Sequence, residues 1–242
     1  LSGCGGQAEG SSSQSASSSS SSSQSVSETS STVVTSSSSS AAAVVVSGQK
    51  SDWNLILVNK DHPISDSYTM TLTTFDSKNK IDSRIEKAYN QMFNDAKKDG
   101  INLYLRSSYR TIATQQLYYD SQYNAYIKAG LSSEQAASKT EELIAPPGCS
   151  EHHTGLALDI ISVEWQNSVG TLSADFEDTD AAKWLRDYAY QYGFILRYMK
   201  DKVGITKYSY EPWHFRYVGV EAATYIKEHN LCLEEYIDLL NK

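Results

Sequence analysis

The feature of this chain that most constrains its fold is a pair of short histidine-containing segments that lie far apart in the sequence. Residues 150–159 read SEHHTGLALD and residues 211–214 read EPWH. A catalytic zinc site takes three protein ligands such as imidazole and carboxylate and keeps a fourth position for water, whereas structural sites are often closed by cysteines. The two segments together therefore predict an open zinc site, and a fold that brings distant parts of the chain to one point.

The local sequence indicates which residues reach the metal. Residues 156–161 form an apolar run typical of a buried strand, so we expect His152 on the approach to this strand and Asp159 on the strand itself. His214 must then come from a separate strand. Glu211 is left close to the metal without being needed as a ligand, which suits a general base that takes a proton from a water molecule activated by zinc.

The two motifs, S-x-H-x-x-G-x-A-x-D and E-x-W-H, resemble those of the zinc D-alanyl-D-alanine carboxypeptidases of the VanY type, which share a fold with the amino-terminal hedgehog domain. The resemblance covers about residues 53–230. It extends to LVNKD at 57–61, SYR at 108–110 with Gln115, and YGFILRY at 192–198. Two metal motifs in the expected order, joined by these landmarks, make a specific signal. One departure is His153, which stands where relatives often carry glutamine.

The resemblance implies a role for each candidate site residue: zinc ligands His152, Asp159 and His214, catalytic base Glu211, and substrate contacts Arg110, Gln115 and Ser150. Arg110 matches the arginine that grips the free carboxylate of the substrate's last residue. A bidentate contact between guanidinium and carboxylate recognises a chain terminus by charge and geometry together, which is what an exopeptidase needs. The alternative for Arg110 is a structural ion pair.

The other histidines and two of the cysteines have simpler interpretations. His62 and His229 are expected to be structural or surface residues. For His153 we favour a place beside the metal site over metal binding, because adjacent residues of an extended chain point to opposite faces. Cys149 invites a thiol-nucleophile interpretation but lacks a separate partner histidine. The sequence does not decide whether it pairs with Cys232.

The amino terminus predicts where the protein works. Residues 1–4, LSGC, resemble a bacterial lipobox, so we expect a lipid on Cys4 and a signal peptide upstream of Leu1. Residues 5–50 are rich in serine and nearly free of charge, and such a segment cannot bury enough apolar surface to fold. We expect a disordered linker there, with the catalytic domain at 51–242, on the extracellular face of the bacterial cell membrane and facing the cell wall.

Composition agrees with this layout. The formal net charge of −8 argues against nucleic acid as a partner. No stretch approaches the roughly 20 apolar residues of a membrane-spanning helix. We expect a monomer that reaches the membrane through the lipid on Cys4.

Periodicity and capping signals predict an α+β fold: a small central antiparallel sheet flanked by helices, with the zinc site on the sheet. The predicted helices are 85–96, 113–128, a stretch from 132 onward, 180–192, 221–229 and 233–240. The predicted strands are 103–105, 156–161, 194–197, 207–210 and 213–218. Gln115 then lies in the first turn of its helix, and Arg110 lies just beyond a short strand.

These features predict a membrane-tethered zinc D,D-carboxypeptidase that removes the terminal D-alanine from peptidoglycan stem peptides. An L,D-carboxypeptidase that acts on tetrapeptide stems is the alternative within the class, because the zinc motifs do not report on the pocket for the penultimate residue. Two alternatives come from other classes: a non-catalytic wall-binding lipoprotein, and a structural zinc domain with a protein partner, as in hedgehog. Loss of a ligand or of Glu211 would mark the former, and neither is lost.

Overall fold

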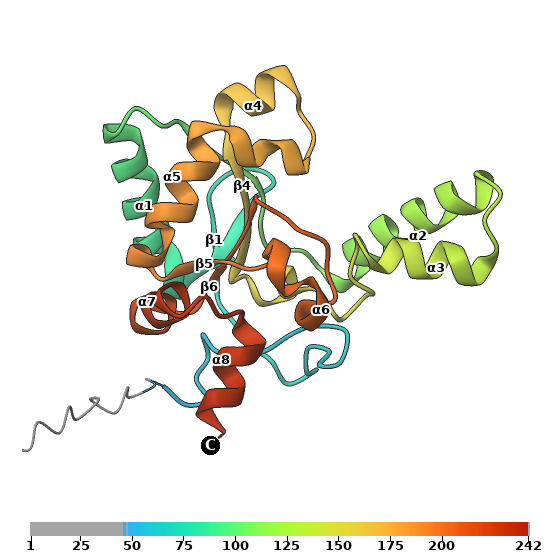
Figure 1. The fold of residues 1–242 in the computed structure, drawn as a ribbon, viewed down its shortest axis with the longest axis horizontal. Helices are drawn as coiled ribbons and strands as arrows, with labels where there is room; N and C mark the ends of the chain where they lie inside the picture. The colour runs from blue at the N-terminus through green and yellow to red at the C-terminus, as the bar shows by residue number, and fades with distance from the viewer. Residues whose placement is uncertain (1–45, 47, 242) are drawn as a thin grey trace, which may run out of the picture. The chain divides into compact units, whose positions relative to one another are not determined.

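A four-stranded antiparallel sheet with the strand order β3-β4-β6-β5 organises the fold (Figure 1). The computed structural model describes Val46 and residues 48–241. The strands of this sheet are β3 Leu103–Ser107, β4 Ala157–Ser162, β5 Phe194–Leu196 and β6 His214–Tyr217. A separate antiparallel pair is formed by β1 Leu72–Thr74 and β2 Lys80–Asp82. The predicted α+β class with a small antiparallel sheet is confirmed.

Helices surround this sheet. They are α1 Glu86–Lys98, α2 Ile112–Lys128, α3 Ser133–Glu141, α4 Val163–Ser168, α5 Asp180–Tyr188, α6 Val203–Thr206, α7 Val220–Glu228 and α8 Leu233–Leu240. Short 3-10 turns cover Ser83–Ile85, Glu151–Thr154, Ala174–Asp178, Ala189–Tyr192 and Lys200–Lys202. In the described part of the chain, no helix is long and apolar enough to cross a membrane. Cys4 and residues 5–45 lie outside the described residues, so the lipobox and most of the linker remain predictions.

Local capping explains where two of the predicted helices begin. The Thr111 hydroxyl accepts a hydrogen bond from the backbone N–H of Thr114 and caps α2. Ser132 and Gln135 form a reciprocal capping box at the start of α3. With these caps, α2 and α3 begin at Ile112 and Ser133, within one residue of the predicted starts at 113 and 132.

Two predicted elements need correction. Residues 207–210 do not form a strand. Lys207 has a φ of 62° and ends α6 in the left-handed region, which an extended strand cannot continue. The alternating pattern there instead reflects Tyr208, which is buried against the ring of Tyr198 at 4.7 Å. The helix predicted for 180–192 ends at Tyr188 and continues only as a 3-10 turn.

The central strand β4 is the best-buried element, and all six of its residues are buried. Leu158 and Ile160 belong to the main hydrophobic core, which also contains Met92 of α1 and Leu185 of α5. Because successive side chains of a strand point to opposite faces, Asp159 between the two core residues faces away from them. The core therefore fixes the direction in which the carboxylate of Asp159 points.

The helices α2 and α3 form a hairpin that projects away from the sheet (Figure 1). The Tyr119 hydroxyl donates to Glu141 Oε1 at 3.1 Å and joins the two helices. Gln115 is the buried residue of α2, whereas Leu117 and Tyr118 on the next turn are exposed. The base of the hairpin is therefore anchored in the body of the domain by Gln115.

Gly155 allows the chain to turn sharply into β4. Its φ is +71°, and an added Cβ would come within 2.9 Å of the backbone nitrogen of Asp82. The same backbone N–H of Asp82 donates to the carbonyl oxygen of Gly155 at 3.0 Å. Gly100 offers a contrast, because it also has a positive φ of +82° but has no atom within 4 Å of an added Cβ.

We therefore expect Gly155→Ala to lower the free energy of unfolding more than Gly100→Ala does. Both variants carry the left-handed backbone strain of about 1–2 kcal/mol, and Gly155→Ala adds about 1–3 kcal/mol for the overlap with Asp82. Urea unfolding followed by circular dichroism measures both losses. Equal losses in the two variants would mean that the contact with Asp82 does not matter.

Candidate metal centre

Strand pairing brings the two sequence motifs together. In the antiparallel pair of β4 and β6, Asp159 lies directly opposite His214. His152 lies in the 3-10 turn Glu151–Thr154, which precedes β4. The ligand atoms of these residues all lie within 4.8 Å of one another, and all three side chains are buried. The structure thus assembles the three residues that the sequence predicts as ligands.

The segment that leaves β3 holds the histidine turn in place. The carbonyl oxygen of Ser108 accepts a hydrogen bond from Nδ1 of His152 at 2.7 Å, and the Arg110 N–H donates to the carbonyl oxygen of His152 at 3.1 Å. His153 Nδ1 in turn donates to the carbonyl oxygen of Arg110 at 2.7 Å. Because Nδ1 of His152 donates a hydrogen bond to Ser108, Nε2 of the same ring carries the lone pair, and this nitrogen faces Asp159.

The donor set fits a zinc ion. Nε2 of His152 lies 3.3 Å from Oδ2 of Asp159, and Nδ1 of His214 lies 3.4 Å from Oδ1 of the same carboxylate. Oδ1 of Asp159 is buried without a hydrogen-bond partner, a costly arrangement that a cation would relieve. Two imidazole nitrogens and one carboxylate are the ligand types of catalytic zinc, which leaves a position for water or substrate.

Charges inside the site are set by burial and by close neighbours. Burial lowers the pKa of His152, which keeps this imidazole neutral. Burial alone would raise the pKa of Asp159, but the adjacent His152 and His214 lower it to about 2. Burial likewise opposes the charged form of His214, yet the carboxylates of Glu151, Glu211 and Asp159 raise its pKa to about 9. A proton on Nδ1 of His214 must therefore leave before this nitrogen can coordinate a cation.

Glu211 lies beside the ligands on the more open side of the site. Its Oε2 is 3.2 Å from Nδ1 of His214, and its side chain is 13% exposed, against 5% for His214. Burial raises the pKa of Glu211, and the contact with His214 opposes that rise. A carboxylate of raised pKa next to a metal site has the properties of a general base.

Arg110 lies beside the cluster with its side chain half-buried, and its guanidinium is held by several partners. It donates to Oε1 of Gln115 at 2.8 Å and to the hydroxyl of Ser107 at 3.0 Å, and it lies 3.8 Å from Oδ2 of Asp159. The exposed ring of Tyr118 lies over it, with 4.9 Å to the ring centroid. A guanidinium has five N–H donors, so donors remain for an anionic ligand.

The two other predicted substrate contacts take part in local structure. Nε2 of Gln115 donates to the carbonyl oxygen of Ala145 at 2.7 Å, which leaves its Oε1 to hold Arg110. The hydroxyl of Ser150 accepts from the N–H of His152 at 3.4 Å and caps the 3-10 turn. Both residues therefore shape the site, and their contacts with a substrate remain predictions.

The remaining histidines lie outside the metal cluster of the described residues. His153 is held by Arg110 through Nδ1, and its Nε2 accepts from the N–H of Gly148 at 3.2 Å. Its place beside the site agrees with the prediction, although the reason is a 3-10 turn and not an extended chain. His62 pairs with Asn59, and His229 stacks on Tyr225.

Cys149 and Cys232 both carry free thiols. Burial raises the pKa of Cys149, which opposes the thiolate form that nucleophilic catalysis requires. The structure therefore provides no support for a thiol nucleophile.

Two residues near His214 were not anticipated. The ring of Tyr198 packs on that of His214 with 4.8 Å between centroids. Glu151, the neighbour of His152 in the sequence, is completely buried beside His214, and the charges of Arg197 and Arg216 hold its pKa well below the ordinary value against the effect of burial. One sequence feature could have pointed to Glu151: it is an acidic residue directly before His152, a predicted metal ligand.

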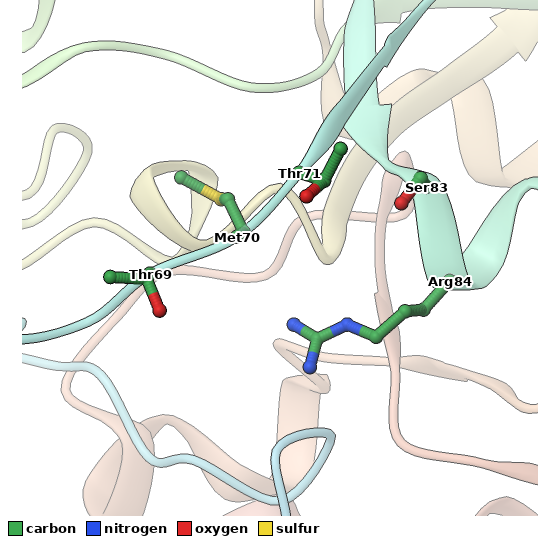
Figure 2. Close-up of a pocket in the computed structure, with 5 residues that line it drawn as sticks. All are labelled: Thr69, Met70, Thr71, Ser83 and Arg84. Carbon is green, nitrogen blue, oxygen red and sulfur yellow. The ribbon is translucent and has the colours of Figure 1, made fainter.

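A surface pocket of about 260 Å³ lies apart from these residues (Figure 2). It is lined by Thr69, Met70, Thr71, Ser83 and Arg84. Figure 2 shows the side chain of Arg84 extending from beside Ser83 toward the segment that carries Thr69. Arg84 is bound by both oxygens of Asp82, at 2.9 and 2.5 Å, and lies over the ring of Trp53. Because this cation is already paired, the pocket offers little to an anionic ligand.

Comparison with known proteins places the site in a family context. Residues 78–220 match the family model described as VanY, D-alanyl-D-alanine carboxypeptidase. The chain is similar to a D-alanyl-D-alanine carboxypeptidase of Enterococcus faecalis, with 41% identity over 191 residues that cover 79% of this chain and 68% of the relative.

Two solved structures extend the comparison. The first is a variant of the vancomycin resistance D,D-pentapeptidase VanY from a VanB-type resistance cassette, in complex with Zn(II). It has a TM-score of 0.68 and 40% identity, over 77% of this chain and 99% of that one. The second is the LD-carboxypeptidase LdcB. It has a TM-score of 0.63 and 38% identity, over 77% of this chain and 86% of that one.

The site predicts that three residues bind the metal and that His153 does not. His152→Ala, Asp159→Ala and His214→Ala should each lose most of the bound zinc, because the ion would keep only two protein ligands. His153→Gln is the matched control, since it changes a buried neighbour that lies outside the cluster, and it should keep its zinc. Metal analysis of the purified folded proteins measures the content. Full zinc content in any of the three alanine variants would contradict the assignment of that ligand.

Proposed function

The chain belongs to the VanY family of D-alanyl-D-alanine carboxypeptidases and is a zinc carboxypeptidase, and on this premise we propose that it removes the terminal D-alanine of peptidoglycan stem peptides with Glu211 as the base. The observation that carries the proposal is the position of Glu211, 3.2 Å from a metal-ligand histidine and on the more open side of the site. The likeness to a zinc-bound D,D-pentapeptidase supports the same substrate class.

In the proposed mechanism the metal is held by His152, Asp159 and His214. Bound zinc supplies Lewis-acid chemistry, because it polarises a carbonyl oxygen and lowers the pKa of water to about 7. Glu211 takes a proton from the attacking water and passes it to the leaving amine of D-alanine. Its raised pKa suits a group that must both accept and return a proton near neutral pH.

Arg110 positions the substrate in this proposal. Its contacts with Ser107 and Gln115 fix the plane of the guanidinium, and its remaining N–H groups can bind the terminal carboxylate. The exposed ring of Tyr118 lies over the same guanidinium, 4.9 Å from its Cζ to the ring centroid. A fixed guanidinium loses little conformational freedom when the substrate binds.

The choice between D,D and L,D activity depends on the pocket for the penultimate residue. The likeness to a D,D-pentapeptidase and the family match support D,D activity, and the likeness to LdcB supports the alternative. We propose D,D-carboxypeptidase activity. Incubation with purified pentapeptide and tetrapeptide stems, followed by mass spectrometry, tests it. Release of D-alanine from the pentapeptide supports the proposal, whereas release only from the tetrapeptide overturns it.

We also propose that the protein is a lipoprotein on the outer face of the cell membrane, on the sequence of residues 1–4 and the serine-rich segment after it. In this arrangement the linker lets the catalytic domain reach the wall from a lipid on Cys4. The full precursor, expressed in a Gram-positive host, should incorporate labelled fatty acid and sediment with membranes, and Cys4→Ser should do neither. Equal labelling of the two proteins contradicts this proposal and leaves the enzymatic one intact.

Glu211→Gln tests whether Glu211 is a general base or a zinc ligand. The amide keeps the size of the side chain but cannot accept the proton, so kcat should fall by about two to four orders of magnitude. Zinc content and the free energy of unfolding should stay close to those of the parent protein. If the variant loses its zinc, Glu211 is a ligand and not the base.

Arg110→Ala tests the carboxylate clamp when it is combined with a change in the substrate. Loss of a charge-assisted contact of about 1.5–3 kcal/mol should lower kcat/KM on a stem peptide by about ten- to a few hundredfold. A stem peptide with an amidated carboxyl terminus should be cut by the parent enzyme with a similar loss, and the variant should lose little more on this substrate.

The outcome that contradicts the clamp is additivity of the two losses. Arg110 lies only 3.8 Å from Oδ2 of Asp159, so a guanidinium that contacts the reacting carbonyl is the competing arrangement. In that arrangement the amide and the variant act independently, and their effects on kcat/KM multiply.

A further inference from the structure

Two buried polar atoms face each other behind the metal cluster. Nε2 of His214 and Oε2 of Glu151 lie 3.7 Å apart, and neither has a hydrogen-bond partner. The side chain of Glu151 has no exposed surface and that of His214 keeps 5%. Such groups are costly when they stay unpaired, so this pair is the natural hydrogen bond of the region.

Glu151 is held so that it cannot turn away. Its Oε1 accepts from Nε of Arg197 at 2.8 Å and from Nη1 of Arg216 at 2.8 Å. Both arginine side chains are completely buried. Because both donors are on Oε1, the second oxygen, Oε2, is left directed at His214.

The ring of His214 is fixed as well. Its Nδ1 faces Asp159 at 3.4 Å and Glu211 at 3.2 Å, and the rings of Tyr198 and His152 pack against it. A neutral imidazole has one N–H and one lone pair. For Nδ1 to offer its lone pair to a metal, the proton must be on Nε2, which is the atom that faces Glu151.

We propose that Glu151 is a positioning residue, which accepts a hydrogen bond from Nε2 of His214 and thereby holds this histidine in the tautomer that binds zinc through Nδ1. The inference rests on the metal role of His214 in the proposed function. A ring movement of under about 1 Å brings the 3.7 Å separation to hydrogen-bonding distance. Acceptors of this kind orient metal-bound histidines and raise their basicity.

The same network reaches the C-terminal helix. The guanidinium of Arg197 also donates to both oxygens of Glu234 on α8, at 2.8 and 2.7 Å. Glu234 therefore neutralises the same arginine as Glu151 but makes no contact with His214 among those described. This relation makes Glu234 a matched control for the effect of charge loss in the buried network.

The test compares Glu151→Gln with Glu234→Gln. In Glu151→Gln the two arginine donors select the amide oxygen, which turns the NH₂ group toward His214 and favours a lone pair on Nε2, the wrong tautomer for Nδ1 ligation. The dissociation constant for zinc, measured on metal-free protein by competition with a chromophoric chelator, should rise by about ten- to a hundredfold. Glu234→Gln should lower the free energy of unfolding and leave zinc affinity within about threefold of the parent.

Equal zinc affinity in the parent and in Glu151→Gln, or an equal loss in both variants, overturns the inference while the proposed function stands. Failure of the parent protein to bind zinc overturns the metal assignment and the inference with it. Nuclear magnetic resonance of the ¹⁵N-labelled, zinc-loaded parent protein gives a result that does not depend on how a variant folds. A ring proton on Nε2 of His214 supports the inference, and zinc bound through Nε2 overturns it.

Discussion

The pairing of β4 with β6 is the constraint on which the rest of the site depends. It sets Asp159 opposite His214, so two residues of the candidate metal centre, from distant segments, meet at a distance fixed by backbone hydrogen bonds. The third residue of this centre, His152, lies in the 3-10 turn before β4, and its hydrogen bond to the carbonyl oxygen of Ser108 ties it to the segment that leaves β3. Leu158 and Ile160 lie in the core on one face of β4, so a shift of register by one residue would turn the carboxylate of Asp159 into that core. The hydrophobic core thus maintains the arrangement of His152, Asp159 and His214.

Buried charges surround this sheet, and they are paired with one another. Glu151 lies between Arg197 and Arg216, and Glu234 closes the far end of the network. Burying an ion is costly unless a partner and hydrogen bonds compensate for the lost water. The network connects the C-terminal helix α8 with the carboxylate of Glu151 that faces His214, which is the arrangement that the proposed positioning role of Glu151 uses.

The sequence predicted the fold class and the three residues that cluster at the candidate metal centre. The clustering of His152, Asp159 and His214 was predictable because ligand chemistry restricts residue type and because an apolar run marked the strand that carries Asp159. The helix predicted to start at about residue 113 likewise placed Gln115 in the first turn of α2. These signals are local, and they do not depend on how distant segments pack.

The errors arose where tertiary contacts override a local pattern. Residues 207–210 alternate like a strand, but the alternation reports the burial of Tyr208 next to a left-handed Lys207. The short pair β1–β2 has only three residues in each strand, too few for a period to be recognised. The contact of Glu151 with His214 joins residues on different elements, and no sequence spacing encodes it.

X-ray absorption at the zinc edge, on the purified domain with one equivalent of metal, tests the central claim most directly. A site built by His152, Asp159 and His214 predicts a first shell of nitrogen and oxygen at about 2.0–2.2 Å with imidazole scattering beyond it. Sulfur at about 2.3 Å would place Cys149 or Cys232 in the shell, and a shell without imidazole scattering would exclude the two histidines. Either result would contradict the account of a metal site built on the pairing of β4 and β6.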